Sequence, residues 1–231
     1  MTKPTNKEFA HIFDSAASRY DAVTSTYAVS RRREFFLAHS KGDILEVGAG
    51  TGEMSRAFLE RGHRVVATDI SPNMVDQIKK KLSIEAVVAD AEHLPFPDAS
   101  FDTVIGAEMM YYLDHPESFV REAYRVLRPG GRLLVSSAND TMRIYDRLRA
   151  LLRKIGFGDA TYFDDKVRRF TKEATLKRML LDNGFTVIHT RKAIIFLIPQ
   201  LDWLSRLCER TPLRYFGMFI FVAAEKLKLP S

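Results

Sequence analysis

The chain has 231 residues, of which 46% are hydrophobic and 28% are charged, as expected for a folded globular protein. The single cysteine, Cys208, excludes an intrachain disulfide and a cysteine-based zinc site, and it predicts a reducing, cytoplasmic setting. The N-terminus lacks the apolar core of a secretory signal, and the longest apolar runs, 193–199 and 218–224, fall short of the roughly 20 residues that span a membrane.

The net charge of +6 comes from the C-terminal part of the chain. Residues 1–140 carry a net charge of −3, whereas residues 141–231 carry +9. Such a basic region can be an ordinary solvated surface, or it can face an anionic substrate, an acidic membrane or nucleic acid. Nucleic acid is the least favoured partner, because no basic segment shows the interleaved aromatic residues that are typical of RNA binding.

Strand-like apolar segments alternate with amphipathic helical segments along most of the chain. Strands are predicted at 43–48, 64–69, 85–90, 101–107 and 132–137. Helices are predicted at 52–62, 71–82 and 116–128. Gly62 should end the first helix, Ser71 and Pro72 should begin the second, and the Pro-Gly-Gly run at 129–131 should end the third. Because the central strands are almost continuously apolar, they are expected to be buried on both faces of a parallel sheet.

Helices and two further strands are predicted at the ends of the chain. Residues 1–40 resemble two helices that cap the sheet, and residues 141–154 form a basic helix. Thr171 should cap a helix at 171–184 that ends at Gly184. Strands at 185–196 and 217–226, with an amphipathic helix at 201–210 between them, complete the predicted fold. The fold class is α/β, with a doubly wound, mostly parallel, seven-stranded sheet.

The segment ILEVGAGTGEMS (44–55) places three glycines between a strand and a helix, where they let the backbone approach a ligand. It is not the dinucleotide fingerprint, which needs glycine where Glu53 stands, and no Walker lysine follows. Glu46 precedes the glycines, where it would repel a pyrophosphate and attract a cation. Alternatively, Glu46 is a surface carboxylate at a strand end.

Two more acids, Asp69 and Asp90, end the next two strands. In a parallel sheet the carboxyl ends of the strands form the ligand crevice. Asp69 follows Gly50 by 19 residues, a spacing that suits a carboxylate bound to ribose hydroxyls. Asp90 could accept a hydrogen bond from the amino group of a base, although either acid could instead cap a helix. S-adenosylmethionine, which carries an ammonium and a sulfonium, is the cationic nucleoside that such a site would suit.

These segments resemble the class I S-adenosylmethionine-dependent methyltransferases, in their small-molecule and quinone-type branch. ILEVGAGTGEMS matches the first motif of that family, E/D-x-G-x-G-x-G, and VVATDISPNMVDQIKKK resembles the second motif. Residues 87–136 resemble the region from the third strand to the fifth. The resemblance covers about residues 10–137 and the last strand. It implies one methyltransferase domain over 1–231, divided into an N-terminal helical cap (1–40), a cofactor-binding core (41–137) and substrate-lid insertions (138–170 and 197–216).

The resemblance also implies which residues contact the cofactor: Tyr20, Glu46, Gly48, Ala49, Gly50, Gly52, Asp69, Ile70, Met74, Asp90, Ala91 and Ala107. The glycine loop would surround the methionine part, Asp69 would hold the ribose, and Ala107 would approach the sulfonium. Tyr20 belongs to FDSAASRYD (13–21), which resembles the segment that closes over the cofactor in this branch. It can equally be a core residue.

The candidates for catalysis are weaker. Many relatives carry an acid and a histidine where this chain has Tyr111 and Tyr112, so neither a histidine base at that position nor a metal site is predicted. Tyr112 could orient an acceptor through its hydroxyl, and His115 could act as a base or be a solvated loop residue. Methyl transfer is an in-line displacement that depends on alignment and on the exclusion of water, so a base is not essential.

The acceptor pocket is expected to come from the N-terminal helices and the C-terminal insertions, with Phe13, Tyr111, Tyr112, Tyr162, Phe163, Phe196 and Trp203 as candidate lining residues. The insertion at 197–216 combines apolar residues (Leu201, Trp203, Leu204, Leu207) with Arg206, Arg210 and Arg214, which favours an amphiphilic acceptor and contact with acidic lipid. Three functions remain open: a small-molecule methyltransferase, a quinone or lipid methyltransferase at a membrane surface, and a protein that binds the cofactor without chemistry.

Overall fold

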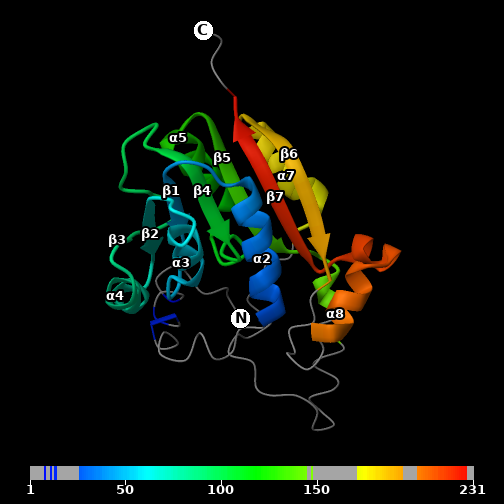
Figure 1. Ribbon diagram of the computed structural model, residues 1–231. Helices are drawn as coiled ribbons and strands as arrows, with labels where there is room; N and C mark the ends of the chain where they lie inside the picture. The colour runs from blue at the N-terminus through cyan, green and yellow to red at the C-terminus, as the bar shows by residue number, and fades with distance from the viewer. Residues whose placement is uncertain are drawn as a thin grey trace.

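A seven-stranded sheet with the order β3-β2-β1-β4-β5-β7-β6 forms the centre of the protein (Figure 1). The computed structural model describes Glu8, His11, Phe13, Asp14, Arg147 and the ranges 26–144, 171–194 and 202–227. The strands are β1 (Ile44–Val47), β2 (Val65–Asp69), β3 (Glu85–Val88), β4 (Phe101–Ala107), β5 (Leu127–Ala138), β6 (Phe185–Ala193) and β7 (Phe219–Lys226). β1 to β5 pair in parallel, and β7 is antiparallel to both its neighbours. The predicted fold class is confirmed.

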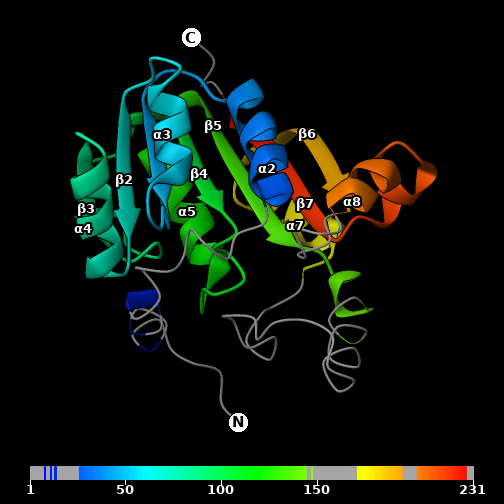
Figure 2. The same ribbon diagram turned by 60° about the horizontal axis from the view of Figure 1, so that its bottom comes forward.

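Helices cover both faces of the sheet (Figure 2). One face carries α2 (Thr26–His39), α3 (Glu53–Leu59) and α4 (Pro72–Lys81), and the other carries α5 (Pro116–Val126) and α7 (Glu173–Asp182). Successive strand residues point to opposite faces, so Ile44 packs in the cluster with α2 and α3, whereas Leu45 packs in the cluster with α5 and α7. Burial on both faces explains why the inner strands β1, β2, β4 and β7 are largely apolar, whereas the edge strands β3 and β6 carry exposed positions.

The crevice predicted at the carboxyl edge follows from the strand order. β1 lies between β2 and β4, so the helical connections on its two sides lead away from each other. In sheets of this kind the ligand crevice opens at that divergence, outside the carboxyl ends of the strands. The glycine loop after β1, Asp69 at the end of β2 and Ala107 at the end of β4 therefore meet at one edge of the sheet.

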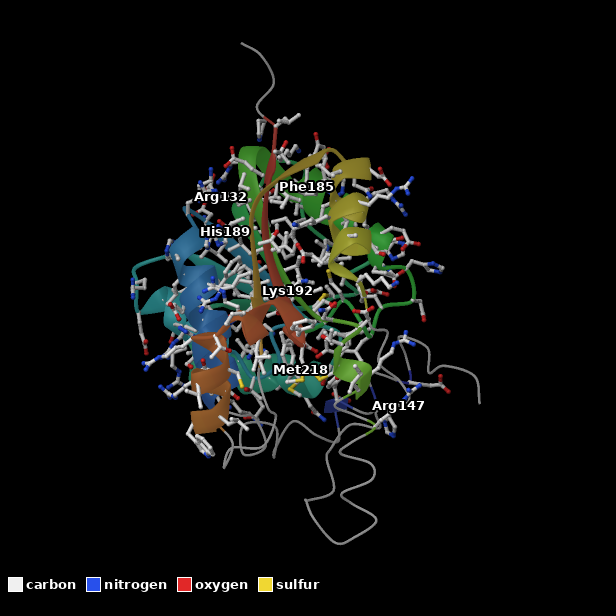
Figure 3. All side chains as sticks on the ribbon, turned by 90° about the vertical axis from the view of Figure 1, so that its right-hand side faces the viewer. Arg132, Arg147, Phe185, His189, Lys192 and Met218 are labelled. Atoms are coloured by element: carbon white, nitrogen blue, oxygen red, sulfur yellow. The ribbon has the colours of Figure 1, made fainter. Side chains whose placement is uncertain are left out.

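The connection between β6 and β7 leaves the sheet at this same edge. β6 and β5 are both antiparallel to β7, so β6 runs in the direction of the parallel strands, and its last residue, Ala193, pairs with the first residue of β7. Figure 3 faces the β6 side of the sheet and shows His189 and Lys192 along that strand. The connection contains α8 (Asp202–Glu209) and the 3-10 helix η3 (Pro212–Phe216). α8 is held beside α2 by an Arg31–Glu209 ion pair of 3.3 Å.

Two predicted boundaries were wrong for identifiable reasons. The helix predicted at 116–128 ends at Val126, and β5 begins at Leu127 rather than at residue 132. Pro129 disfavours a helical conformation at the preceding residue, and Leu127 instead pairs with Phe101. Thr171 does not cap α7, because it lies one residue before the N-cap. It instead forms an isolated bridge with Asn139, the residue after β5, and its backbone N–H donates to the Ala138 carbonyl. Lys172 occupies the N-cap of α7 without a side-chain hydrogen bond.

The remaining boundaries differ by a few residues. α3 ends at Leu59 and is followed by Gly62 at φ 80°, and β3 ends at Val88, so Asp90 lies just beyond its strand. Most of the predicted helix at 141–154 and of the insertion at 138–170 lies outside the described residues, as do residues 195–196 of the predicted sixth strand. The single-domain division predicted from the resemblance stays a prediction. No helix in the described ranges is both long and apolar enough to cross a bilayer.

Candidate active site

An open cleft of about 700 Å³, a volume that includes open solvent, lies at the carboxyl edge of β1, β2 and β4. Its lining residues come from the ends of these strands and the loops that follow them, from the loop after β3, from α4, and from the N-terminal segment. They are Phe13, Val47, Gly48, Gly50, Asp69, Ile70, Met74, Ala89, Asp90, Ala91, Ala107, Glu108, Met109, Tyr112 and Leu113. The structure brings together in this lining eight of the twelve residues predicted to contact a cofactor. They are Gly48, Gly50, Asp69, Ile70, Met74, Asp90, Ala91 and Ala107.

The glycine loop forms one wall of the cleft with a backbone that needs glycine. Gly48 and Gly52 have φ values of 68° and 83°, in the left-handed region that L side chains rarely adopt. A Cβ on Gly48 would also lie 3.0 Å from the Cβ of Met109, and one on Gly52 would lie 3.0 Å from Leu82 Cδ1. Gly48 therefore keeps the cleft open beside Met109, and Gly52 lets the loop pack on the helix after β2.

Asp69 connects the glycine loop to the start of α4. It is 7% exposed, and its Oδ2 accepts the Gly50 N–H at 2.8 Å while its Oδ1 accepts the Ser71 N–H at 3.0 Å. Burial raises the pKa of Asp69 to about 6, and these backbone hydrogen bonds oppose that rise. A carboxylate that already holds two loops in place is preorganised for a ligand, because its free lone pairs point from a fixed position.

Glu46 is buried behind the cleft rather than in its lining. The side chain is 2% exposed, and its Oε2 accepts the Ser55 hydroxyl at 2.5 Å. Burial raises the pKa of Glu46 to about 7. It is therefore not the surface carboxylate that the sequence left as an alternative, and its contact with a bound cation stays a prediction. Ala49 and Gly52 also lie outside the lining, where Ala49 N–H bonds to the Thr68 carbonyl and Gly52 N–H bonds to the Ala49 carbonyl.

The charge in the cleft suits a cation. Among the described lining residues, Asp69, Asp90 and Glu108 are acids, and none is lysine or arginine. A phosphate would meet repulsion here without a compensating base, whereas an ammonium or sulfonium would be attracted. Ile70, Met74 and Ala91 add apolar walls against which a flat base can pack. The residues present therefore fit a cationic nucleoside such as S-adenosylmethionine.

The N-terminal segment contacts the cleft through Phe13 and the start of α4 through Asp14. Phe13 lines the cleft and packs edge-to-face on Tyr112, with ring centroids 5.2 Å apart. Asp14 accepts the Ser71 hydroxyl and the Asn73 N–H, the latter at 3.1 Å, at the start of α4. This contact was not anticipated, although Asp14 stands inside the segment predicted to close over the cofactor. Tyr20 lies outside the described residues.

Glu108 is the functional candidate that the sequence analysis missed. It follows β4 directly, lines the cleft, and has a φ of 56°, which is unusual for a residue with a long side chain. Its N–H donates to Ser136 Oγ at 3.0 Å, and its Oε2 accepts the Tyr111 hydroxyl at 3.2 Å. The sequence did contain a signal for Glu108, because it is an acid immediately after the fourth strand. Glu46, Asp69 and Asp90 had been selected for their positions at strand ends.

The residues proposed for catalysis and for the acceptor pocket differ in whether they line the cleft. Tyr112 lines the cleft, whereas His115 is 68% exposed in its side chain and lies outside the lining. Tyr111 is buried against Glu108, and Trp203 is 62% exposed on α8. The other predicted acceptor residues, Tyr162, Phe163 and Phe196, lie outside the described residues. No three His, Cys, Asp or Glu side chains in the described part of the chain gather as a metal site, and the absence of a metal stays a prediction.

The loops on the β4 side of the cleft are tied together by a buried acid. Glu92 is 7% exposed, and its Oε1 accepts the backbone N–H groups of Asp114 and His115 at 3.0 and 2.9 Å. These two residues immediately precede α5. Glu92 thus fixes the segment that carries Tyr112 and Leu113 to the loop that carries Asp90 and Ala91.

Comparisons with known proteins identify the family of this chain. A family model described as a methyltransferase domain matches residues 45–135. The ubiquinone/menaquinone biosynthesis C-methyltransferase UbiE of Chromobacterium violaceum is 33% identical over 202 residues, which are 76% of this chain and 83% of that protein. The protein of the same name from Pseudomonas aeruginosa is 31% identical over 208 residues, 78% of this chain and 81% of that protein.

A solved structure supports the fold. The S-adenosylmethionine-dependent methyltransferase from Thermotoga maritima, described as a possible histamine N-methyltransferase, superposes with a TM-score of 0.69. It is 23% identical and covers 94% of this chain and 99% of its own. This likeness shows that the two proteins share a fold over almost their whole length.

Proposed function

The chain belongs to the class I S-adenosylmethionine-dependent methyltransferases, and from that premise we propose that it methylates a ring carbon of a quinone precursor. It is a methyltransferase enzyme, S-adenosylmethionine is its cofactor, and its acceptor is a small molecule. The observation that carries the proposal is the 33% identity to UbiE over 76% of this chain, since UbiE is named a C-methyltransferase of quinone biosynthesis. We also propose a cytoplasmic location, supported by the lone cysteine.

Residues on the β1–β2 side of the cleft would hold the cofactor. Asp69 would accept hydrogen bonds from the ribose hydroxyls, Ile70 and Met74 would pack on the adenine, and Asp90 would accept a hydrogen bond from the adenine amino group. The acids around the glycine loop offset the positive charge of the methionine part. When bound, S-adenosylmethionine supplies a methyl group on a positively charged sulfur that a nucleophilic atom can take up.

Residues on the β4 side would hold the acceptor. Phe13, Met109, Tyr112 and Leu113 give this side an aromatic and apolar lining that suits a ring and excludes water. A ring carbon is nucleophilic when the ring carries electron-donating hydroxyls, and it is electron-poor when these are oxidised to carbonyls. The acceptor is therefore the hydroquinone form.

A deletion strain tests this function. In bacteria that lack their own quinone C-methyltransferase, expression of this chain should restore the ring-methylated quinone, measured by mass spectrometry of extracted lipids. Asp69→Asn should not restore it, and Asp76→Asn should, because Asp76 is an exposed acid on α4. If cells that express folded wild-type protein or folded Asp76→Asn accumulate only the unmethylated quinone, the result would count against a quinone acceptor and favour another organic acceptor.

A second feature favours action at a membrane surface. α8 and η3 expose Trp203, Leu207, Leu213 and Phe216 by 62, 53, 51 and 68%, and we name these four residues the α8–η3 patch. Arg206, Arg210 and Arg214 are interspersed among them and exposed. Aromatic and leucine side chains beside arginines are typical of elements that lie on anionic bilayers. Because this connection leaves the carboxyl edge of the sheet, docking by the patch would bring the cleft toward the lipid (Figure 1).

Vesicle sedimentation tests the membrane contact. The protein should bind vesicles containing phosphatidylglycerol, bind phosphatidylcholine vesicles less, and dissociate from the former as salt rises. The double variant Trp203→Ala/Phe216→Ala should lose this binding without losing stability, because both side chains are exposed. Leu181→Ala is the matched control, since Leu181 is 57% exposed on α7. Equal binding by the wild type and the double variant would contradict the role of the patch.

A further inference from the structure

One acid in the cleft, Glu108, is not among the residues assigned to the cofactor. Glu108 Oε1 is buried and has no hydrogen-bond partner among the described residues, whereas Oε2 accepts the Tyr111 hydroxyl. The other unpartnered buried atoms in the described part of the chain belong to Arg32, Thr190 and Glu209, which do not line the cleft. Leaving a buried carboxylate oxygen without a donor is unfavourable, so a ligand that donates to it would gain the difference.

The backbone fixes where this oxygen lies. Glu108 adopts a left-handed conformation that few long side chains tolerate, and its N–H is bound to Ser136 Oγ on the neighbouring strand β5. Strained conformations of this kind persist when surrounding contacts impose them, and they gather at sites that need a set geometry. The Tyr111 hydroxyl then holds one carboxylate oxygen and leaves the other for a ligand.

The surroundings indicate which ligand that is. Glu108 is next to Met109 in the chain and shares the β4 side of the cleft with Tyr112 and Leu113. A ligand there must be largely apolar and must carry one hydrogen-bond donor. Asp69 and Asp90 lie on the other side, where the nucleoside is assigned.

We propose that Glu108 Oε1 accepts a hydrogen bond from a ring hydroxyl of the methyl acceptor and thereby selects the reduced, hydroquinone form. This inference rests on the proposed function for the identity of the ring. An oxidised ring has carbonyl oxygens in place of hydroxyls, so it has nothing to donate and its oxygen would face a carboxylate oxygen. Glu108 is then the group by which the site distinguishes a nucleophilic ring from an electron-poor one.

Binding to the two redox forms of one ring tests the proposal. The probes are a monoprenylated 1,4-naphthohydroquinone and its quinone, titrated without oxygen into the protein saturated with S-adenosylhomocysteine. The wild type should bind the hydroquinone at least about tenfold more tightly, because a hydrogen bond to a charged acceptor is among the strong ones. Glu108→Gln should bring this ratio close to one, since an amide can accept from a hydroxyl and can also donate to a carbonyl. Glu60→Gln, an exposed acid after α3, should keep the wild-type ratio.

A second measurement shows whether Glu108 serves the cofactor instead. S-adenosylhomocysteine should bind the wild type and Glu108→Gln equally well, which also reports that the variant is folded. An unchanged redox ratio in Glu108→Gln, or a loss of S-adenosylhomocysteine affinity alone, would overturn the proposal. Should the glutamine variant not fold, Glu108→Asp retracts the carboxylate by one methylene and should lower the same ratio.

A second ligand pair separates this inference from the proposed function. 1-Naphthol and 1-methoxynaphthalene differ in one donor and involve no quinone. If the wild type prefers 1-naphthol, loses that preference in Glu108→Gln and does not bind the prenylated ring, the hydrogen-bonding role of Glu108 is supported. The same result rejects a quinone precursor as the acceptor. Absence of any hydroxyl preference with both pairs would reject the role of Glu108, and restoration of the methylated quinone in cells would still support the function.

Discussion

At the residue scale, two acids, one lining the cleft and one buried behind it, have surroundings that disfavour their charge. Glu46 and Asp69 are both buried, and burial raises their pKa values to about 7 and about 6. A protein that needed only stability would place neutral groups at these positions. A cationic ligand would stabilise the ionised form of these carboxylates, which burial disfavours.

Glu46 gives a pH dependence of stability with a definite sign. Its pKa rises from 4.5 in the unfolded chain to about 7 in the folded protein, so the folded state holds more protons between these values. The free energy of unfolding should therefore fall as pH rises from 4.5 to about 7, by about 3 kcal/mol for this group. Asp69 should add a fall in the same direction up to about pH 6.

Urea unfolding of the cofactor-free protein at several pH values measures this dependence. The free energy of unfolding of Glu46→Gln should change less between pH 5 and 7 than that of the wild type. Above that range the variant should be more stable than the wild type. It keeps a neutral side chain beside Ser55. Glu60→Gln is the surface control and should retain the wild-type dependence. Identical profiles for the wild type and Glu46→Gln would show that the buried carboxyl does not control stability in this range.

Some residues of the site could be predicted from the sequence and others could not. The three acids at successive strand ends were found because each stands next to a recognisable strand or glycine motif. Glu108 was missed because its significance depends on a left-handed φ and on one unpartnered oxygen, and neither property can be read from neighbouring letters. For the same reason, the burial of Glu46 was not foreseen.

At the element scale, the parts that carry the site are held by side-chain to backbone hydrogen bonds. Arg125 on α5 donates to the carbonyls of Leu94 and Phe96, at 2.9 and 2.7 Å, and pairs with Glu122. Glu122 in turn accepts the Leu94 N–H at 2.8 Å. The loop after β3 is thereby fixed to the helix after β4, and the two sides of the cleft keep a set separation.

Glu92 is the most sensitive point of this arrangement. Glu92→Ala would leave the N–H groups of Asp114 and His115 without their acceptor, and it should lower the free energy of unfolding by about 2–3 kcal/mol. Hydrogen exchange should become faster at residues 113–115, measured by mass spectrometry. Glu117→Ala is the control, because Glu117 is 46% exposed in its side chain on the same side of the molecule. Unchanged exchange in Glu92→Ala would contradict the anchoring role.

Element boundaries show where local patterns were insufficient. α5 and α7 were predicted from periodicity, yet β5 begins five residues early because Leu127 pairs with Phe101 across the sheet. In α8 the residues predicted to form one apolar side separate, with Trp203 and Leu207 exposed. Leu204 is only partly exposed, and Ser205 is fully buried. Tertiary contacts decided both cases.

At the scale of the whole molecule, one edge of the sheet gathers the functional parts. The glycine loop, the acids and Glu108 lie at the carboxyl ends of the parallel strands, and the connection that carries the α8–η3 patch leaves the same edge (Figure 2). The fold and the location of the cleft could be predicted because strand periodicity and three motifs are local signals. The exposure of the patch could not, because it depends on packing between distant elements.

The position of the transferred methyl group tests the central claim most directly. The protein is incubated with S-adenosylmethionine labelled with ¹³C in its methyl group and with the monoprenylated naphthohydroquinone, and the product is read by carbon NMR. We predict an aryl methyl signal from a ring carbon, present with the wild type and lost with Asp69→Asn. A methoxyl signal, or label in the product of Asp69→Asn at the wild-type rate, would contradict the assignment of this cleft to carbon methylation.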